Sequence, residues 1–171
     1  MSMDEIFNHI CHPIFWPISM NDFKAKINFH TIDEEGFNVS DSIHIKSQLH
    51  GHPNGALSFR VYSNDKNFTY ITDCEHPDSQ LNKKLIDLAD NTDLLIHDSH
   101  FTEEDLIEHK GWGHSSWAQS VSMAKESNAK QLILFHHNPA YSDSKLKNIE
   151  SMAQESFEKT VSARQGLVIY L

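Results

Sequence analysis

Ionisable residues follow three short strand-like runs of the sequence. The run LILF at positions 132–135 is followed by His136, and the runs FTYIT and LLIH are followed by Asp73 and Asp98. An unbroken apolar run of this length is typical of a strand that is covered on both faces. In such sheets, ligands bind beyond the carboxyl ends of the strands, and imidazole and carboxylate groups suit Zn²⁺ and similar ions. The pattern therefore predicts a shared metal-type site at one edge of a sheet.

Two more histidines lie in segments that contain glycine. His52 stands in LHGHPN, between Gly51 and Pro53, and a second histidine stands in GWGHSSW. Glycine and proline predict loops at both places. The candidate site residues are therefore His52, Asp73, Asp98, His114 and His136.

The elements that must position these residues are strands first, and then strands that alternate with helices. Period-two alternation predicts strands at 25–29, 43–50 and 57–61, and the last of these forms a hairpin with 68–73. This order favours a sheet covered by helices over a helical bundle. The other expected elements are helices at 3–11, near 81–88, after Thr102, after Ser115 or Ser116 and at 146–157, and strands at 94–97, 132–135 and 167–171.

Length and composition predict one domain over residues 1–171 and restrict the partners. The net charge of −10 argues against long nucleic acid as a partner, because tracking it requires a basic face. It is compatible with a small anionic substrate held at a metal ion. The two cysteines form no motif and favour a reducing, cytoplasmic setting. The chain contains no apolar run long enough to predict a membrane span.

In order and in neighbouring residues, the five site residues resemble the second half of the metallo-β-lactamase fold, and most closely its phosphodiesterase branch, which includes ribonuclease Z. The resemblance rests on GHPNGALSFR, YITDCEHPD, LLIHDSH, GWGHSSW and LILFHHNP, and it runs from about Pro13 onward. It implies an α/β fold: an incomplete αββα sandwich, mainly its C-terminal half, with a mixed sheet flanked by helices. It also implies that His52, Asp73 and His136 are metal ligands.

The resemblance further implies a two-metal zinc site, with manganese or iron as alternatives. In the family an aspartate bridges the two metals, which hold a hydroxide that attacks the substrate, and Asp73 matches that bridge. His114 matches the histidine of the ribonuclease Z-like GHS loop, and Asp98 its acidic partner. In this interpretation Asp98 orients His114, which stabilises the developing negative charge or protonates the leaving oxygen.

The sequence departs from the family pattern in its first ligand cluster, His-x-His-x-Asp-His. His9-Ile-Cys-His12 lacks its spacing and its aspartate, and His50-Gly-His52 is not followed by Asp-His. Each metal would then keep one histidine and a share of Asp73, where four or five ligands are usual. Three interpretations follow: the chain is a fragment, it pairs with another polypeptide, or it has lost catalysis.

Alternative interpretations accompany these assignments. His50 or His137 could replace its neighbour as a ligand, although His137 is expected to be structural or to line the pocket. The pair Asp98–His114 could be a hydrogen bond that only fixes a loop. Among the other residues, Cys74 is expected to be a packed thiol, Trp112 a loop anchor, Trp117 a core residue, and His76, His97 and His100 solvated polar residues.

Two functions from different classes are consistent with this pattern. The first is a metal-dependent hydrolase, a phosphodiesterase that acts on a cyclic nucleotide or a similar small phosphodiester. The second is a non-catalytic half-domain that self-associates or pairs with a partner chain, because half of a sandwich exposes an apolar surface and an open sheet edge. The sequence leaves the metal, the substrate and the oligomeric state open.

Overall fold

A computed structural model describes residues 2–32, 36–77 and 80–171 of the chain. The chain forms two compact units, Met1–Ile32 and Asp33–Leu171. A single domain over residues 1–171 stays a prediction. Among the described residues, no helix is both long enough and apolar enough to cross a membrane.

The first unit holds the predicted N-terminal helix. Helix α1 (Met3–Ile10) begins at a capping box, in which Ser2 and Glu5 each accept a hydrogen bond from the other's backbone amide. A short 3₁₀ helix, η1, covers Met20–Asp22. The strand predicted at 25–29 is wrong, because these residues form no regular element. Phe29 instead packs against Phe7 of α1, with 5.2 Å between the ring centroids, and no described strand pairs with its backbone.

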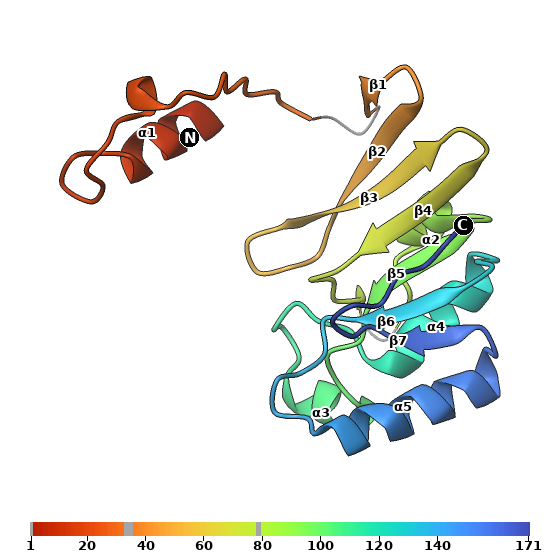
Figure 1. The fold of residues 1–171 in the computed structure, drawn as a ribbon. Helices are drawn as coiled ribbons and strands as arrows, with labels where there is room; N and C mark the ends of the chain where they lie inside the picture. The colour runs from red at the N-terminus through yellow and green to blue at the C-terminus, as the bar shows by residue number, and fades with distance from the viewer. Residues whose placement is uncertain (1, 33–35, 78–79) are drawn as a thin grey trace. The chain divides into compact units, whose positions relative to one another are not determined.

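The second unit is built on one mixed seven-stranded sheet, with its strands in sequence order (Figure 1). The first four strands pair antiparallel and the last three join in parallel, so that β2, β4, β5, β6 and β7 all run in the same direction. Their carboxyl ends therefore lie at one edge. The strands are β1 (Phe37–Ser40), β2 (Ile43–His50), β3 (Ala56–Ser63), β4 (Lys66–Ile71), β5 (Leu94–Asp98), β6 (Leu132–Phe135) and β7 (Thr160–Ser162).

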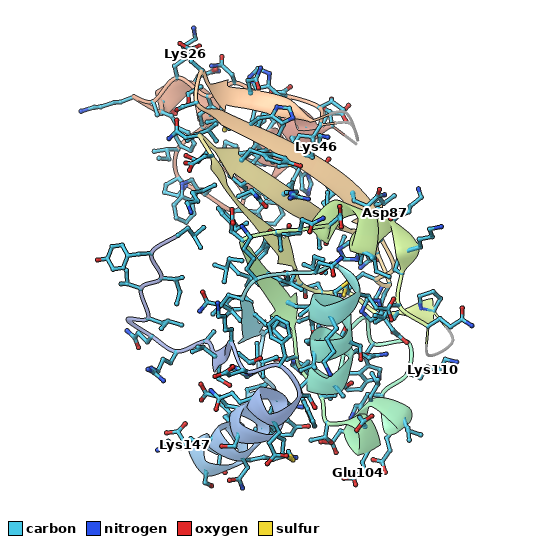
Figure 2. The ribbon with its side chains drawn as sticks, turned by 90° about the vertical axis from the view of Figure 1, so that its right-hand side faces the viewer. Lys26, Lys46, Asp87, Glu104, Lys110 and Lys147 are labelled. Atoms are coloured by element: carbon cyan, nitrogen blue, oxygen red, sulfur yellow. The ribbon has the colours of Figure 1, made fainter. Side chains whose placement is uncertain are left out.

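Helices connect the parallel strands, as the sequence predicts. They are α2 (Lys83–Ala89), α3 (Glu103–Glu108), α4 (Trp117–Glu126) and α5 (Asp143–Ser156). Each begins at a residue whose side chain accepts a hydrogen bond from a backbone amide in the first turn, and these residues are Asn82, Thr102, Ser116 and Ser142 respectively. Figure 2 shows the charged side chains of Asp87, Glu104 and Lys147 on the outer surfaces of these helices.

One face of the sheet forms the core with the helices. Ile71, Leu95 and Leu134 alternate toward this face and pack with Leu85 of α2 and Ile149 of α5, all at most 2% exposed. Burying a side chain of this size contributes about 1.5–3 kcal/mol. The first three residues of β5 and all of β6 are apolar because these strands are also buried on the other side of the sheet, through Leu94 and Ile133.

The opposite face of the sheet is also apolar but is only partly covered. The strand register places Phe59 beside Tyr70 and Val61 beside Phe68 on this face, and all four are partly exposed. Leu57, two residues before Phe59, is 39% exposed.

The end of the chain differs from the prediction. Residues 167–171 form no strand, and the last strand of the sheet is β7, which the sequence did not predict. β7 pairs in parallel with β6, whereas 167–171 have no described strand partner. Val168 is 65% exposed and Tyr170 is 91% exposed. The apolar residues of this segment therefore do not pack in the core, and an apolar pattern without such packing does not form a strand.

Candidate functional site

The candidate residues gather at the carboxyl ends of the strands. Asp73 follows β4, Asp98 ends β5 and His136 follows β6, while His52 lies in the loop after β2. Asp73 and His136 have left-handed backbones, with φ of 54° and 58°. This conformation is uncommon for residues other than glycine and ends each strand with a sharp turn.

Asp98 is the buried centre of the site. It is 0% exposed. Its Oδ2 accepts hydrogen bonds from the Asp73 amide and from His114 Nδ1, both at 3.0 Å. Its Oδ1 accepts from the amides of His100 and Ser115, both at 3.1 Å. Burial alone would raise the pKa of Asp98, but contacts from His114, His136 and Ser115 hold the pKa well below its usual range.

The contact with Asp98 fixes the tautomer of His114. Because Asp98 is an anion, His114 Nδ1 carries the proton of this hydrogen bond, and a neutral ring then has its lone pair on Nε2. Carboxylates orient functional histidines in this way in metal sites and in proton-transfer sites.

His136 links Asp98 to Asp73. Its Nδ1 lies 3.5 Å from Asp98 Oδ2, and its Nε2 lies 3.7 Å from Asp73 Oδ1. Nδ1 is buried and has no well-aligned hydrogen-bond partner among the described residues, so its contact with Asp98 is mainly electrostatic. Asp98 raises the pKa of His136. The side chains of His136 and Asp73 are 35% and 43% exposed, so both can be reached from solvent.

His52 joins the site through the loop of His114. The two rings lie 6.1 Å apart. Gly113 packs directly against His52, since a Cβ at Gly113 would lie 2.3 Å from His52 Cδ2. Contacts thus connect all five candidate residues, and their roles as ligands or catalytic groups stay predictions.

Three imidazoles stack at the mouth of this site. His100, His114 and His136 each offer a ring nitrogen within 4.8 Å of the others. Their centroids lie 4.4–5.2 Å apart and their planes differ by 20–34°. Lone pairs lie in the ring planes, so nearly parallel rings do not direct them toward one point. In this orientation the three imidazoles are not a ligand set for one ion.

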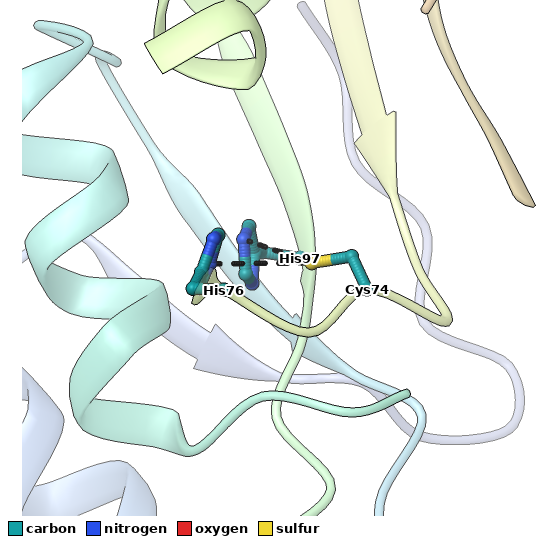
Figure 3. Close-up of side chains that lie close together, drawn as sticks. All are labelled: Cys74, His76 and His97. Carbon is teal, nitrogen blue, oxygen red and sulfur yellow. Dashed lines mark hydrogen bonds between the residues drawn. The ribbon is translucent and has the colours of Figure 1, made fainter. Parts of the chain in front are cut away.

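A second cluster is buried beneath the site (Figure 3). Cys74 Sγ lies 4.0 Å from His76 Nε2 and 3.8 Å from His97 Nε2. His76 Nδ1 accepts from the Asn82 amide at 3.2 Å, so in the neutral ring the proton is on Nε2. A nitrogen that carries a proton has no lone pair for an ion. The cluster is therefore hydrogen-bonded core, and Cys74 is the packed thiol that the sequence predicts.

The prediction of solvated roles for His76, His97 and His100 is wrong. His97 is 0% exposed and His76 is 5% exposed, while His100 is half-buried and donates from Nδ1 to the His136 carbonyl at 2.9 Å. His97 lies on the helix-covered face of β5, where its Nδ1 donates to the Asp98 carbonyl at 2.8 Å. The structure also shows where the two alternative metal ligands lie. His50 is buried, and His137 lines a cavity together with His136.

The buried histidines predict that the fold is less stable in acid. Burial lowers the pKa of His76 to about 3, and it also lowers the pKa of His97 and His50. A lowered folded-state pKa contributes stability above the unfolded value of about 6.5, and this is lost as the pH falls toward the folded value. We therefore expect the free energy of unfolding to decrease from pH 6.5 toward pH 4, by about 1.4 kcal/mol per pH unit for each proton.

Urea denaturation at pH 7.5, 6 and 5 measures this effect. His76→Gln removes one titrating group and is expected to reduce the slope, whereas His9→Gln, at an exposed residue of α1, leaves it unchanged. Equal stability at pH 7.5 and pH 5 would contradict the prediction.

Comparison with known proteins supports the relation that the motifs indicate. The family model described as beta-lactamase superfamily domain matches residues 10–137. Ribonuclease Z of Archaeoglobus fulgidus is 38% identical over 90 residues, which cover 50% of this chain and 28% of the relative. Ribonuclease Z of Bacillus subtilis is 34% identical over 92 residues, which cover 54% of this chain and 30% of the relative. The match thus spans less than a third of each relative.

Solved structures share the fold at low sequence identity. The metallo-beta-lactamase fold protein YhfI from Bacillus subtilis aligns with a TM-score of 0.66 and 20% identity, over 80% of this chain and 52% of that chain. The Zn²⁺-bound PqqB from Methylobacterium extorquens aligns with a TM-score of 0.58 and 17% identity, over 83% and 51%. This chain therefore has a metallo-β-lactamase-like α/β fold and covers about half of those chains.

Proposed function

Because this chain belongs to the beta-lactamase superfamily domain family, we propose that it is a metal-dependent hydrolase of phosphodiester bonds. The observation that carries the proposal is the convergence of two aspartates and three histidines at one sheet edge, with Asp98 bonded to His114 and in contact with His136. The matching relatives are named for ribonuclease activity, which supports phosphodiester hydrolysis as the reaction class.

The spacing of Asp73 and His136 supports a metal ion held by these two residues, with His52 as the third ligand that the family resemblance implies. His136 Nε2 and Asp73 Oδ1 lie 3.7 Å apart, and two ligands at about 2.0–2.2 Å from one ion are separated by about 3–4 Å. His136 Nδ1 lies 3.5 Å from the Asp98 carboxylate, and in a neutral ring with its proton on Nδ1 the lone pair of Nε2 is free to bind the ion. When bound, a divalent ion supplies positive charge that polarises the phosphoryl group. Zinc fits imidazole and carboxylate donors, as manganese and iron also do.

Asp98 and His114 have the geometry of a proton-transfer pair. The Asp98 carboxylate holds the imidazole in place through Nδ1. His114 Nε2 then donates a proton to the leaving oxygen of the substrate. Proton transfer by a positioned side chain contributes typically 10²–10⁴-fold to a rate.

A cavity beside His136 supports an anionic substrate. It has a volume of about 420 Å³ and is lined by Phe135, His136, His137, Ala163, Arg164 and Gln165. Arg164 is one of two arginines in the chain. The other, Arg60, is buried and donates to the carbonyls of Leu88 and Asp90 near the end of α2. A phosphate group beside His136 would lie near the Arg164 guanidinium, which suits phosphate geometry.

The substrate is proposed at the level of the phosphodiester bond. The small-substrate prediction has no support from the relatives, whose names describe RNA cleavage. The net charge of −10 still opposes long nucleic acid. The assay therefore compares bis-p-nitrophenyl phosphate, a cyclic nucleotide and a structured RNA.

The test is turnover by the purified chain, first stripped of metal and then supplied with Zn²⁺ or Mn²⁺. We expect metal-dependent release of p-nitrophenolate from bis-p-nitrophenyl phosphate, reduced at least about 100-fold in His136→Gly because a ligand is lost. Glycine is chosen because it accepts the left-handed backbone at this position. His9→Gly removes an exposed histidine of α1 as the control. A folded chain without metal-dependent turnover on any of the substrates would contradict the proposal.

The helix-free sheet face favours a second candidate function. Leu57 and the partly exposed aromatic residues Phe59, Phe68 and Tyr70 form an apolar surface. Surfaces of this kind mark interaction sites. In this candidate, the chain is a half-domain that covers the face with a second copy or a partner chain. Light scattering after size-exclusion chromatography separates the cases, since a monomer at micromolar concentration would contradict self-association.

A further inference from the structure

Glu75 connects the three loops that carry His52, Asp73 and His114. Its carboxylate accepts two backbone hydrogen bonds from the His114 loop: Oε1 from the Gly111 amide at 2.7 Å and Oε2 from the Gly113 amide at 2.8 Å. Its own amide donates to the Gly51 carbonyl at 3.2 Å, beside His52. Asp73 lies two residues before it in the chain.

The loop that Glu75 holds has little structure of its own. Gly111 and Gly113 have φ of 87° and 88°, a left-handed conformation that side chains other than glycine rarely adopt. Trp112, between them, is 59% exposed, but it has the loop contact that the sequence predicts, because its ring packs edge-on against His109 with 4.6 Å between the centroids. Hydrogen bonds to an ionised acceptor are about twice as strong as those between neutral groups. The Glu75 carboxylate is therefore a strong attachment of residues 111–113.

The position of this loop determines the geometry of the site. Gly113 packs against His52 so closely that a Cβ would lie 2.3 Å from the ring. The next residue is His114, whose Nδ1 donates to Asp98 at 3.0 Å. A displacement of residues 111–113 would therefore change both the contact of Gly113 with His52 and the hydrogen bond of His114 to Asp98.

From these contacts we propose that Glu75 is a positioning residue that holds His114 on Asp98 and against His52. It acts through the backbone of the loop. The consequence for catalysis rests on the proposed function, whereas the consequence for His114 does not. A shift of about 1 Å in a catalytic group can cost about 10²-fold in rate.

Glu75→Gln tests the proposal, because it keeps the shape of the side chain but replaces one acceptor oxygen with an NH₂ group that cannot accept a hydrogen bond. We expect amide hydrogen exchange at Gly111 and Gly113 to become about 10-fold faster. We also expect the His114 Nδ1–H signal, observed in long-range ¹H–¹⁵N spectra, to broaden or disappear. If the wild type turns over substrate, kcat decreases about 10-fold while KM is unchanged.

Glu150→Gln is the matched control. Glu150 also accepts a backbone hydrogen bond, from the Ser162 amide at 3.2 Å, and this bond joins α5 to β7 and not two loops of the site. Its substitution is expected to leave the His114 signal and the exchange of residues 111–113 unchanged. Glu75→Asp keeps the charge on a shorter side chain and is expected to restore part of both signals.

The outcomes separate this proposal from the proposed function. An unchanged His114 signal in Glu75→Gln overturns the positioning role, even if the glycine amides exchange faster. If Glu75→Gln does not fold, the same criterion is applied to Glu75→Asp. A wild-type chain without metal-dependent turnover contradicts the proposed function, and the exchange and His114 measurements then still decide the role of Glu75.

Discussion

Asp98→Ala is expected to destabilise the fold by roughly 3–5 kcal/mol, the range measured when one partner of a buried ionic network is removed. Asp98 is fully buried and accepts four hydrogen bonds, from the amides of Asp73, His100 and Ser115 and from the ring of His114. Alanine leaves all four donors without that acceptor, and an unsatisfied buried donor costs about 1–3 kcal/mol before water or local movement compensates.

Urea denaturation at pH 7.5 measures this loss. Asp93→Ala is a control, because Asp93 also accepts from a backbone amide, that of Asn67, but lies outside the site and pairs with the exposed Lys130. The Asp93 side chain is 10% exposed and accepts from one amide where Asp98 accepts from three, so we expect a smaller loss in Asp93→Ala than in Asp98→Ala. A loss of less than about 1 kcal/mol in Asp98→Ala would contradict the central structural role of Asp98.

The same network has a pH signature with a defined sign. The folded-state pKa of Asp98 lies below its usual value, so its contribution is fully present above the unfolded pKa of about 3.9 and is lost as the pH falls through the folded value. Asp98 also raises the pKa of His136, which adds stability below the unfolded histidine pKa of about 6.5. The stability difference between wild type and Asp98→Ala is therefore expected to increase from pH 7.5 to pH 5 and to shrink only in stronger acid.

The ends of the parallel strands could be predicted because their sequence pattern is local. An apolar run followed by an ionisable residue fixes both the strand and the edge where its last side chain lies, and this placed Asp73, Asp98 and His136 correctly at one edge. The hairpin of β3 and β4 was predictable for the same reason, since a turn and two alternating runs lie within one short segment.

The features that were missed depend on contacts between distant residues. Nothing in the sequence around His97 indicates that the Asp98 carbonyl and Ser120 Oγ satisfy its ring in the core. The role of Glu75 depends on glycine amides 36 and 38 residues away. A faint signal was present, because Glu75 lies two residues after Asp73 and the glycines immediately precede His114.

Asp73→Asn is expected to lower the Zn²⁺ affinity of the chain by about 100-fold or more while the fold is kept. Asparagine tolerates the left-handed backbone of residue 73, with its φ of 54°. The backbone amide that donates to Asp98 is also retained. Only the negative charge and one acceptor oxygen are lost. Mutation of a group that merely supports a metal ligand typically lowers metal affinity by about 10–100-fold, so loss of a ligand oxygen is expected to cost at least as much.

Isothermal titration of the metal-free protein with Zn²⁺ measures this affinity, and the shift in melting temperature on adding Zn²⁺ reports the same binding through linkage. Asp87→Asn makes the same charge change on the exposed side of α2 and is expected to bind like wild type. Equal affinities of Asp73→Asn and wild type would show that Zn²⁺ binds elsewhere. If Asp73→Asn instead loses binding while Asp98→Ala loses stability, then Asp98, the buried carboxylate, maintains the structure of the site, and Asp73, the exposed one, binds the metal.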